Sequence, residues 1–226
     1  MTEECWLIFN DKSHGADANM AIDALLFNQV KQPLLRFYSW DKPAISIGVS
    51  QRYTKTLRDG FDLVRRQTGG GVVDHSNSYT YTLVFPANHH MVSEDTLVCY
   101  QRINEAVKRA ILNMDFSVDL TAEEIDKDVP RDMMACSAHP TKYDIVQNSS
   151  KISGCAQRRT KNGVLHQGYI SNMVGDEVEL RKQIVKELAQ SFGCSWTEFK
   201  KWNNFDQELA QLVEEQYGNE VWSKRR

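Results

Sequence analysis

The segment Arg65-Arg66-Gln67-Thr68-Gly69-Gly70-Gly71-Val72-Val73-Asp74-His75 places three consecutive glycines between two predicted β-strands. Apolar residues 61–64 precede it, and the β-branched and aromatic residues 79–85 follow it, so both flanks are typical of strands. Consecutive glycines let the backbone adopt unusual conformations and let a ligand come close to the main chain. Their N–H groups can line a concavity for an anion or a carbonyl oxygen, and the two arginines can hold a phosphate or carboxylate. Three glycines alone are also typical of a flexible hairpin loop.

A second informative segment lies about 80 residues further along the chain. It reads Lys151-Ile152-Ser153-Gly154-Cys155-Ala156-Gln157-Arg158-Arg159 and continues to Gly163-Val164-Leu165-His166-Gln167-Gly168. Taken alone, Lys151 is typical of a solvated lysine at the end of a strand, because lysine is seldom fully buried.

Together the two segments resemble the signatures of the lipoate–protein ligase and octanoyltransferase family, which shares a catalytic fold with the biotin ligases. The resemblance extends over roughly residues 15–172 and includes an opening helix with Asn-Met-Ala-Ile-Asp at 19–23. The chain departs from the pattern at Gln167, where a second histidine is common in the family. The resemblance implies an α+β fold with a mixed, largely antiparallel sheet flanked by helices.

The resemblance also implies a site. Lys151 would contact the acyl carboxyl or carbonyl group and stabilise negative charge on it, a task that suits a compact ammonium. An apolar tunnel would take the acyl chain, lined by some of Trp40, Ile47, Val73 and Tyr81. The residues expected to bind the acyl or adenylate group are Arg66, Gly69, Gly70, Gly71, Val72, Val73, His75, Gly154, Ala156 and His166. No metal site is expected.

A third segment, residues 135–145, separates two mechanisms. ATP-dependent lipoate ligases usually have Gly-Arg-Asn-Asp-Ile/Leu here, of which only Asp144-Ile145 remains. Cys136 followed by Pro140 and Tyr143-Asp144 resembles the octanoyltransferases that hold the acyl chain as a thioester on a cysteine. A nearby lysine can lower the pKa of such a thiol. Without the resemblance, Cys136 is typical of a buried structural cysteine, and Cys155 is a competing candidate for which packing is the better interpretation.

The favoured activity is therefore the attachment of a C8 acyl group, octanoyl or lipoyl, to a lysine of a carrier domain. Acyl would move from a carrier thioester to Cys136 and then to the lysine amine, without a cofactor. The resemblance implies lipoyl domains of 2-oxoacid dehydrogenase E2 subunits or the glycine cleavage H protein as partners, with octanoyl acyl carrier protein as a donor. One alternative is an ATP-dependent lipoate–protein ligase that needs lipoate, ATP and Mg²⁺. Another is a non-catalytic protein that binds lipoyl domains.

Composition narrows the class of protein further. The chain has 226 residues, 41% of them hydrophobic, and a net charge of −3, so neither nucleic acid nor a membrane is an expected partner. Its acidic start lacks a signal peptide pattern, which favours a cytoplasmic location. The odd number of cysteines without CxxC spacing argues against a disulfide framework or a zinc site. We expect one catalytic domain over residues 1–226, with a short helical segment from about residue 176.

Periodicity predicts the elements of this domain. Helices are expected over 15–27, capped by Asp17 or Asn19, over 93–114, and in two segments between 180 and 217, the last with Gly218 as its C′ residue. An acidic loop is expected over 120–135. Strands are expected over 5–9, 34–40, 44–48, 61–64, 79–85, 143–146, 151–157 and 164–170.

Overall fold

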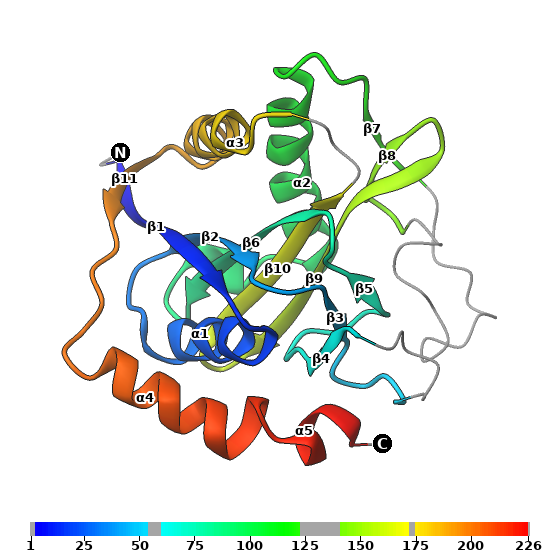
Figure 1. The fold of residues 1–226 in the computed structure, drawn as a ribbon. Coiled ribbons are helices and arrows are strands. Elements are labelled where there is room, and N and C mark those ends of the chain that lie inside the picture. Colours follow the sequence, from blue (N-terminus) through cyan, green and yellow to red (C-terminus); the bar gives the residue numbers. More distant parts are fainter. Residues whose placement is uncertain (1–2, 54–59, 123–140, 172–174, 226) are drawn as a thin grey trace.

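The computed structural model describes residues 3–53, 60–122, 141–171 and 175–225, and its centre is an eight-stranded sheet between helices (Figure 1). The strand order in this sheet is β11-β1-β2-β6-β10-β9-β8-β7. A smaller sheet has the order β4-β3-β5. The strands are β1 (Glu4–His14), β2 (Leu34–Trp40), β3 (Ala44–Ile47), β4 (Asp62–Arg65), β5 (Val73–Asp74), β6 (Ser78–Pro86), β7 (Asp119–Leu120), β8 (Ile145–Gln147), β9 (Ser150–Thr160), β10 (Gly163–Ser171) and β11 (Cys194–Glu198).

The expected mixed, largely antiparallel sheet is confirmed. Strand β1 pairs in parallel with both β2 and β11, whereas the other pairs of the large sheet are antiparallel. Strand β10 lies in the middle, between β6 and β9, and its residues 163–170 are all buried. A strand covered on both faces needs a nearly continuous run of buried residues, which explains why its polar members, such as His166 and Gln167, are inside the protein.

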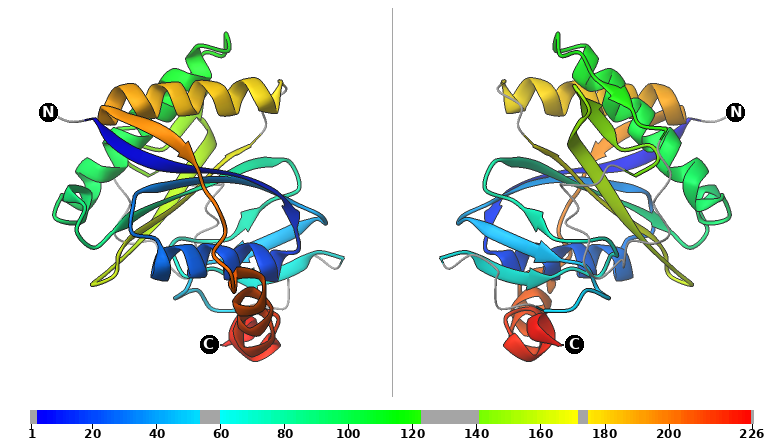
Figure 2. Two further views of the ribbon diagram at one scale, coloured as in Figure 1. Left: turned by 90° about the vertical axis from the view of Figure 1, so that its left-hand side faces the viewer. Right: turned by 90° about the vertical axis from the view of Figure 1, so that its right-hand side faces the viewer.

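Helices cover both faces of the large sheet (Figure 2). The second and third helices pack against one face, and the first and fourth pack against the other. Side chains cap two of them: Asp95 accepts the Leu97 N–H, and Asp176 accepts the Val178 N–H. The helices are α1 (Ala16–Gln29), α2 (Thr96–Leu112), α3 (Glu177–Phe192), α4 (Phe205–Leu212) and α5 (Glu220–Lys224), with a 3₁₀ turn η1 (His90–Val92) and a π-helical turn η2 (Val213–Tyr217).

The predicted side-chain cap of α1 is wrong, and Gly218 follows the last helical turn as predicted but without the left-handed conformation of a C′ glycine. Helix α1 begins after Gly15 without a side-chain cap, and Asn19 lies inside it, donating to the carbonyls of His14 and Ser39. Gly218 has φ −79°, so it does not end a helix in the left-handed conformation. Gly193 does so after α3, with φ 65° and its N–H on the Ala189 carbonyl.

The segment after residue 176 is not only helical. Strand β11 adds a parallel edge strand beside β1, pairing Cys194 with Glu4. Helix α4 and turn η2 then pack on α1, and α5 lies against β4. The chain therefore returns from one edge of the large sheet to the small sheet (Figure 1). The acidic loop predicted over 120–135 lies mostly outside the described residues.

The larger core cluster lies between the sheet and helices α2 and α3. The Trp6 side chain is fully buried there, with its ring edge-on to Phe85 at 5.4 Å and to Trp196 at 5.6 Å between ring centroids. Such aromatic pairs stabilise a core beyond the apolar area that they bury. This cluster fixes the large sheet that carries one wall of the site described below.

A buried charge cluster lies on the other face, where α1 crosses β2. Arg36 is fully buried and donates to Asp11 Oδ2 at 3.0 Å and to Asp23 Oδ1 at 2.7 Å. It also donates to the backbone carbonyl and the side-chain oxygen of Asn19. Because a buried guanidinium needs paired charges and full hydrogen bonding, this cluster fixes α1 on the sheet.

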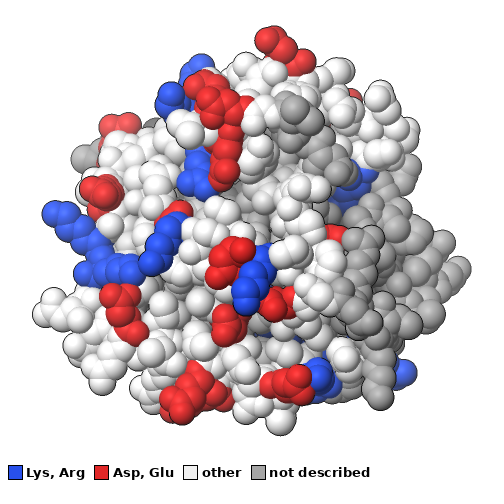
Figure 3. All heavy atoms as spheres, viewed as in Figure 1, with Lys and Arg blue, Asp and Glu red and all other residues white. Residues whose placement is uncertain are grey.

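No helix among the described residues combines the length and hydropathy that crossing a bilayer requires. On the face shown in Figure 3, the coloured acidic and basic side chains are interspersed. That part of the surface has no large area of positive charge of the kind that binds nucleic acid.

Candidate active site

The two signature segments meet at one pocket, as the sequence predicts. The pocket lies between the large sheet and the small sheet and is partly open to solvent, with a cavity volume of about 30 Å³. Residues 66–75 contribute Arg66, Val73 and His75 to its wall, and the second segment contributes Lys151, Cys155, Ala156, Gln167 and Gly168. The remaining lining residues are Met20, Tyr38, Trp40, Ser46, Thr80 and Tyr169.

Arg66 organises the glycine-rich loop. Its guanidinium donates to the carbonyls of Gly69 at 2.7 Å and Gly71 at 2.8 Å, and to the carbonyl and hydroxyl of Ser46 at 3.0 and 3.1 Å. These bonds engage the Arg66 N–H groups that would otherwise donate to a bound phosphate or carboxylate. A direct role of Arg66 in binding an acyl or adenylate group stays a prediction.

Arg65 is not one of the residues that line the pocket, although the sequence predicts that both Arg65 and Arg66 can hold a phosphate or carboxylate. Its fully buried guanidinium donates to the Gly48 carbonyl at 2.8 Å and the Gln51 carbonyl at 2.6 Å. It also donates to the carbonyls of Trp222 and Arg225. Arg65 therefore joins the C-terminal segment to the loop after β3.

Close backbone approach explains one of the glycines around this loop. A Cβ on Gly48 would lie 2.0 Å from the Gly70 carbonyl oxygen, so only glycine fits at position 48. Gly70 itself has φ 83°, in the region that favours glycine. The three-glycine segment is therefore pressed onto the loop after β3 and is not a free hairpin tip.

Lys151 is buried and paired with a carboxylate, which was not foreseen. Its Nζ lies 2.7 Å from Asp144 Oδ2, and the two side chains are only 4% and 3% exposed. Asp144 Oδ2 also accepts from the N–H and hydroxyl of Thr141. The alternative of a solvated strand-end lysine is wrong, and the site contains an ammonium with a fixed counter-ion.

Two local features place this ion pair. Gly154 leaves the space that Lys151 occupies, because a Cβ there would lie 2.3 Å from Lys151 Cε and 2.6 Å from its Nζ. Tyr143, just before Asp144, has φ 72°, a conformation that is costly for a non-glycine residue. Asn104 on α2 donates to the Tyr143 carbonyl at 2.8 Å and so supports this turn.

His75 is a neutral, fixed residue of the pocket wall. Its Nε2 lies 2.8 Å from Ser46 Oγ and its Nδ1 3.3 Å from Ser78 Oγ, and the Trp40 ring stacks on it at 4.0 Å. Burial, helped by the nearby Arg66 charge, lowers the pKa of His75 to about 3.

Cys155 lines the pocket but is not an activated nucleophile. Burial and the Asp144 carboxylate raise the pKa of its thiol, more than the Asn104 hydrogen bond and Lys151 lower it. The Sγ accepts from Asn104 Nδ2 at 3.3 Å. A thiol that stays protonated at neutral pH suits packing, as the sequence interpretation favours.

His166 lies outside the pocket lining. It is fully buried between Tyr81 and Tyr100, and its Nδ1 accepts from Gln157 Nε2 at 3.0 Å. Burial lowers the pKa of His166 to about 3, with a smaller contribution from Arg159. The pocket lining also omits Gly69, Gly70, Gly71, Val72 and Gly154, and of the four expected tunnel residues it includes Trp40 and Val73 but not Ile47 or Tyr81. The binding roles of these residues stay predictions.

The two buried histidines predict acid sensitivity. A folded-state pKa of about 3, against an unfolded value near 6.5, means that their contribution is complete above pH 6.5 and is lost as pH falls toward 3. Each costs about 2 kcal/mol of unfolding free energy by pH 5. His166→Asn keeps an acceptor for Gln157 but lacks the imidazole. Between pH 7.5 and pH 5, denaturant unfolding should therefore show a decrease in the free energy of unfolding that is about 2 kcal/mol smaller in this variant than in the wild type. Equal losses in both proteins would contradict the assignment.

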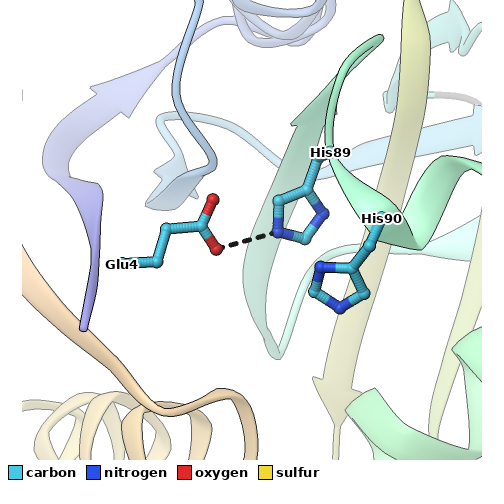
Figure 4. A group of neighbouring side chains, drawn as sticks. All are labelled: Glu4, His89 and His90. Carbon is cyan, nitrogen blue, oxygen red and sulfur yellow. Dashed lines mark hydrogen bonds and ion pairs between the residues drawn. The ribbon is translucent and has the colours of Figure 1, made fainter. Parts of the chain in front are cut away.

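A second cluster, Glu4 with His89 and His90, brings potential metal ligands within 4.8 Å of one another (Figure 4). His89 is buried, whereas His90 is exposed. Its Nδ1 accepts the Met91 N–H, which leaves its proton on Nε2, 3.1 Å from Glu4 Oε2. A metal at Nε2 would need the other tautomer and would break the Met91 bond, so this geometry favours a structural role.

Cys136, the predicted nucleophile, lies outside the described residues. Asn104, which holds the Asp144 turn and Cys155, was missed by sequence reasoning. Its signal was available: it is a polar residue on the otherwise apolar, buried face of α2. A buried polar side chain in a helix usually has a specific partner.

Comparisons with known proteins identify the family of the chain and its fold. A family model described as the lipoyl protein ligase A/B catalytic domain matches residues 16–199. The octanoyltransferase LipM of Exiguobacterium sp. (strain ATCC BAA-1283 / AT1b) is 34% identical over 192 residues, which cover 79% of this chain and 70% of that protein. The LipM of Macrococcus caseolyticus is 32% identical over 182 residues, covering 74% of this chain but only 66% of the relative, slightly less than two thirds of its length. A solved lipoate-protein ligase A bound with ATP has a TM-score of 0.79 over 99% of both chains at 18% identity, which shows a shared fold.

Proposed function

Because the chain belongs to the lipoyl protein ligase A/B catalytic-domain family, we propose that it attaches a C8 acyl group to a lysine of a lipoyl carrier domain. The observation that carries this proposal is the buried Lys151 ammonium, which lines one pocket together with the flanks of the glycine-rich loop. The carrier would be a lipoyl domain of a 2-oxoacid dehydrogenase E2 subunit or the glycine cleavage H protein.

The pocket offers an apolar region and a charged end. Met20, Trp40, Val73 and Tyr169 supply apolar surface for the acyl chain. Each methylene that they bury contributes about 0.8 kcal/mol to binding. The Lys151 ammonium would lie at the acyl carbonyl and stabilise the negative charge that develops on its oxygen during transfer.

The favoured route is octanoyl transfer through Cys136. Its thiolate attacks the carbonyl of an octanoyl carrier thioester, a new C–S bond forms, and the carrier thiolate leaves and takes up a proton. The neutral amine of the target lysine then attacks the enzyme thioester, the C–S bond breaks as an amide forms, and the amine proton passes to solvent as the Cys136 thiolate is released. This route needs no cofactor. The names of the octanoyltransferase relatives support it.

The alternative is an ATP-dependent lipoate–protein ligase, favoured by the fold shared with the ATP-bound ligase. In that reaction Arg66 and the glycine-rich loop would hold the adenylate phosphate, and ATP and Mg²⁺ would activate the lipoate carboxyl. The Arg66 donors are engaged with Gly69 and Gly71 in this structure, so a phosphate would have to replace those bonds. This geometry supports the transferase over the ligase.

Mass spectrometry of the intact protein separates the two reactions. The chain is incubated with octanoyl acyl carrier protein alone, or with lipoate, ATP and Mg²⁺, and a lipoyl domain is then added. The transferase proposal expects one octanoyl group on the enzyme in the first mixture and its passage to the lipoyl domain. Modification of the lipoyl domain only in the second mixture would favour the ligase, and none in either would overturn the acyl-transfer proposal.

Gly154 gives a sharper test of the lysine geometry. In Gly154→Ala the added Cβ meets the flexible end of Lys151, so the side chain should move away from Asp144 while the fold survives. We expect acyl transfer to fall by about tenfold to a hundredfold, as for a misplaced catalytic group. The matched control is Gly175→Ala, whose Cβ would have no neighbour closer than 3.4 Å. Equal steady-state rates for both variants would show that the Lys151 position is not important.

A further inference from the structure

The buried Asp23 carboxylate accepts hydrogen bonds from two separate parts of the fold. Its Oδ1 accepts from Arg36 at 2.7 Å. Its Oδ2 accepts from Thr82 Oγ1 at 2.8 Å and from Gln167 Nε2 at 2.7 Å, with the Tyr38 hydroxyl further away at 3.2 Å. Asp23 is only 1% exposed, so each of these donors compensates a charge that has lost its water.

The other end of the Gln167 amide reaches the glycine-rich loop. Its Oε1 accepts from Thr68 Oγ1 at 2.7 Å. Thr68 is fully buried and immediately precedes Gly69, and its carbonyl accepts the Val49 N–H at 2.9 Å. A continuous chain of hydrogen bonds therefore runs from the Arg36–Asp23 pair through Gln167 to the loop.

Chemistry fixes the direction of this amide. A carboxylate only accepts hydrogen bonds, so the NH₂ group of Gln167 must face Asp23, and its oxygen then accepts the Thr68 hydroxyl. Gln167 belongs to β10 of the large sheet, whereas Thr68 follows β4 of the small sheet. The bond thus connects the large sheet, which carries the pocket-lining Gln167, to the segment that leads into the glycine-rich loop.

We propose that Gln167 is a positioning residue. Its side chain connects Thr68, at the start of the glycine-rich loop, to the buried Asp23 and so fixes the position of the loop relative to the large sheet. Glutamine holds one arrangement of donor and acceptor at every pH, whereas a histidine at this place would gain a second donor on protonation. The inference rests on the proposed function only for its kinetic readout. The charged and titratable groups around this amide are Asp23 from α1, Arg36 and Tyr38 from β2, Arg66 and His75 from the loop and its flank, and Lys151 and Cys155 from β9.

Gln167→Glu tests the proposal through pH. The new carboxylate keeps an acceptor for Thr68 but faces Asp23, and two carboxylates at this distance share a proton when the pH is lowered. The Val49 amide, bonded to the Thr68 carbonyl, reports the position of the loop by hydrogen exchange. We expect its protection factor to fall about tenfold at pH 8 and to recover toward wild type at pH 5.5, because protonation restores the donor. Acyl transfer kcat should follow the same pH dependence.

Two further variants separate positioning from stability. Thr68→Val cuts the link at its other end without touching Asp23, so Val49 protection should fall at all pH values. Thr82→Val removes a donor from the same Asp23 oxygen but leaves the loop, so it should lower the melting temperature while Val49 protection stays at the wild-type level. Full Val49 protection in both Gln167→Glu at pH 8 and Thr68→Val would overturn the proposal. Because exchange is measured without substrate, a failure of the acyl-transfer proposal leaves this test intact.

Discussion

Replacing Lys151 with glutamine should lower acyl transfer by about a hundredfold to a thousandfold while the protein stays folded. The loss is that expected when one preorganised group no longer stabilises charge on the reacting carbonyl oxygen. Glutamine keeps a donor for Asp144 Oδ2, which now lies 2.7 Å from the Lys151 ammonium. Steady-state kinetics with a saturating acyl donor should show the loss in kcat.

The choice of glutamine matters because alanine would test two effects together. Lys151→Ala leaves the buried Asp144 carboxylate without its cation, which typically costs about 3–5 kcal/mol. The Thr141 donors offset part of that cost. Lys161→Ala, at the exposed turn after β9, is the matched control and should be unchanged in rate and stability. Near wild-type kcat in Lys151→Gln would remove Lys151 from the reaction.

The sequence predicted most of the sheet, because local alternation and composition define its longer strands. Strand β2 spans the predicted residues 34–40, and β6 and β10 differ from prediction by a residue or two at their ends. Strand β11 was missed because five residues with weak alternation become a strand only by pairing with Glu4–Ile8 at the other end of the chain. Long-range pairing of this kind leaves little local signal.

The sequence predicted which residues form the site better than it predicted the hydrogen bonds and ion pairs between them. The resemblance placed Lys151 and the glycine-rich loop at one pocket, and the pocket lining contains Lys151 and the residues that flank the loop but none of its three glycines. The Asp144 ion pair depends on the positive φ of Tyr143 and on Asn104, and neither follows from a motif. Arg65 was taken for a ligand donor because a sequence does not show which main-chain carbonyls surround a buried guanidinium.

The second large effect on acyl transfer is expected from substitution of Cys136, which lies outside the described residues. The four cysteines that the structure describes are less suited to act as the nucleophile. Burial raises the pKa of the Cys99 and Cys155 thiols, and it raises the pKa of the Cys194 thiol to about 12. All three are therefore poor nucleophiles at neutral pH. The Cys5 thiol is bonded to Thr197 Oγ1 at 3.0 Å, beside the edge strand β11 and outside the pocket lining. The four cysteines that the structure describes are therefore poor candidates, and Cys136 stays the nucleophile that the sequence resemblance predicts.

We accordingly expect octanoyl acyl carrier protein alone to load wild-type enzyme with one acyl group, labile to hydroxylamine as thioesters are. Peptide mapping should place it on Cys136. Cys136→Ser should show no adduct at neutral pH and a complete loss of transfer within detection, because a serine hydroxyl does not ionise as a thiol beside a lysine does. Cys155→Ser should still form the adduct, since its buried thiol is not the acceptor. An adduct mapped to Cys155 would identify this pocket-lining cysteine as the nucleophile instead. An unmodified enzyme with rapid ATP-dependent lipoylation would establish the ligase mechanism and leave the family and the fold unchanged.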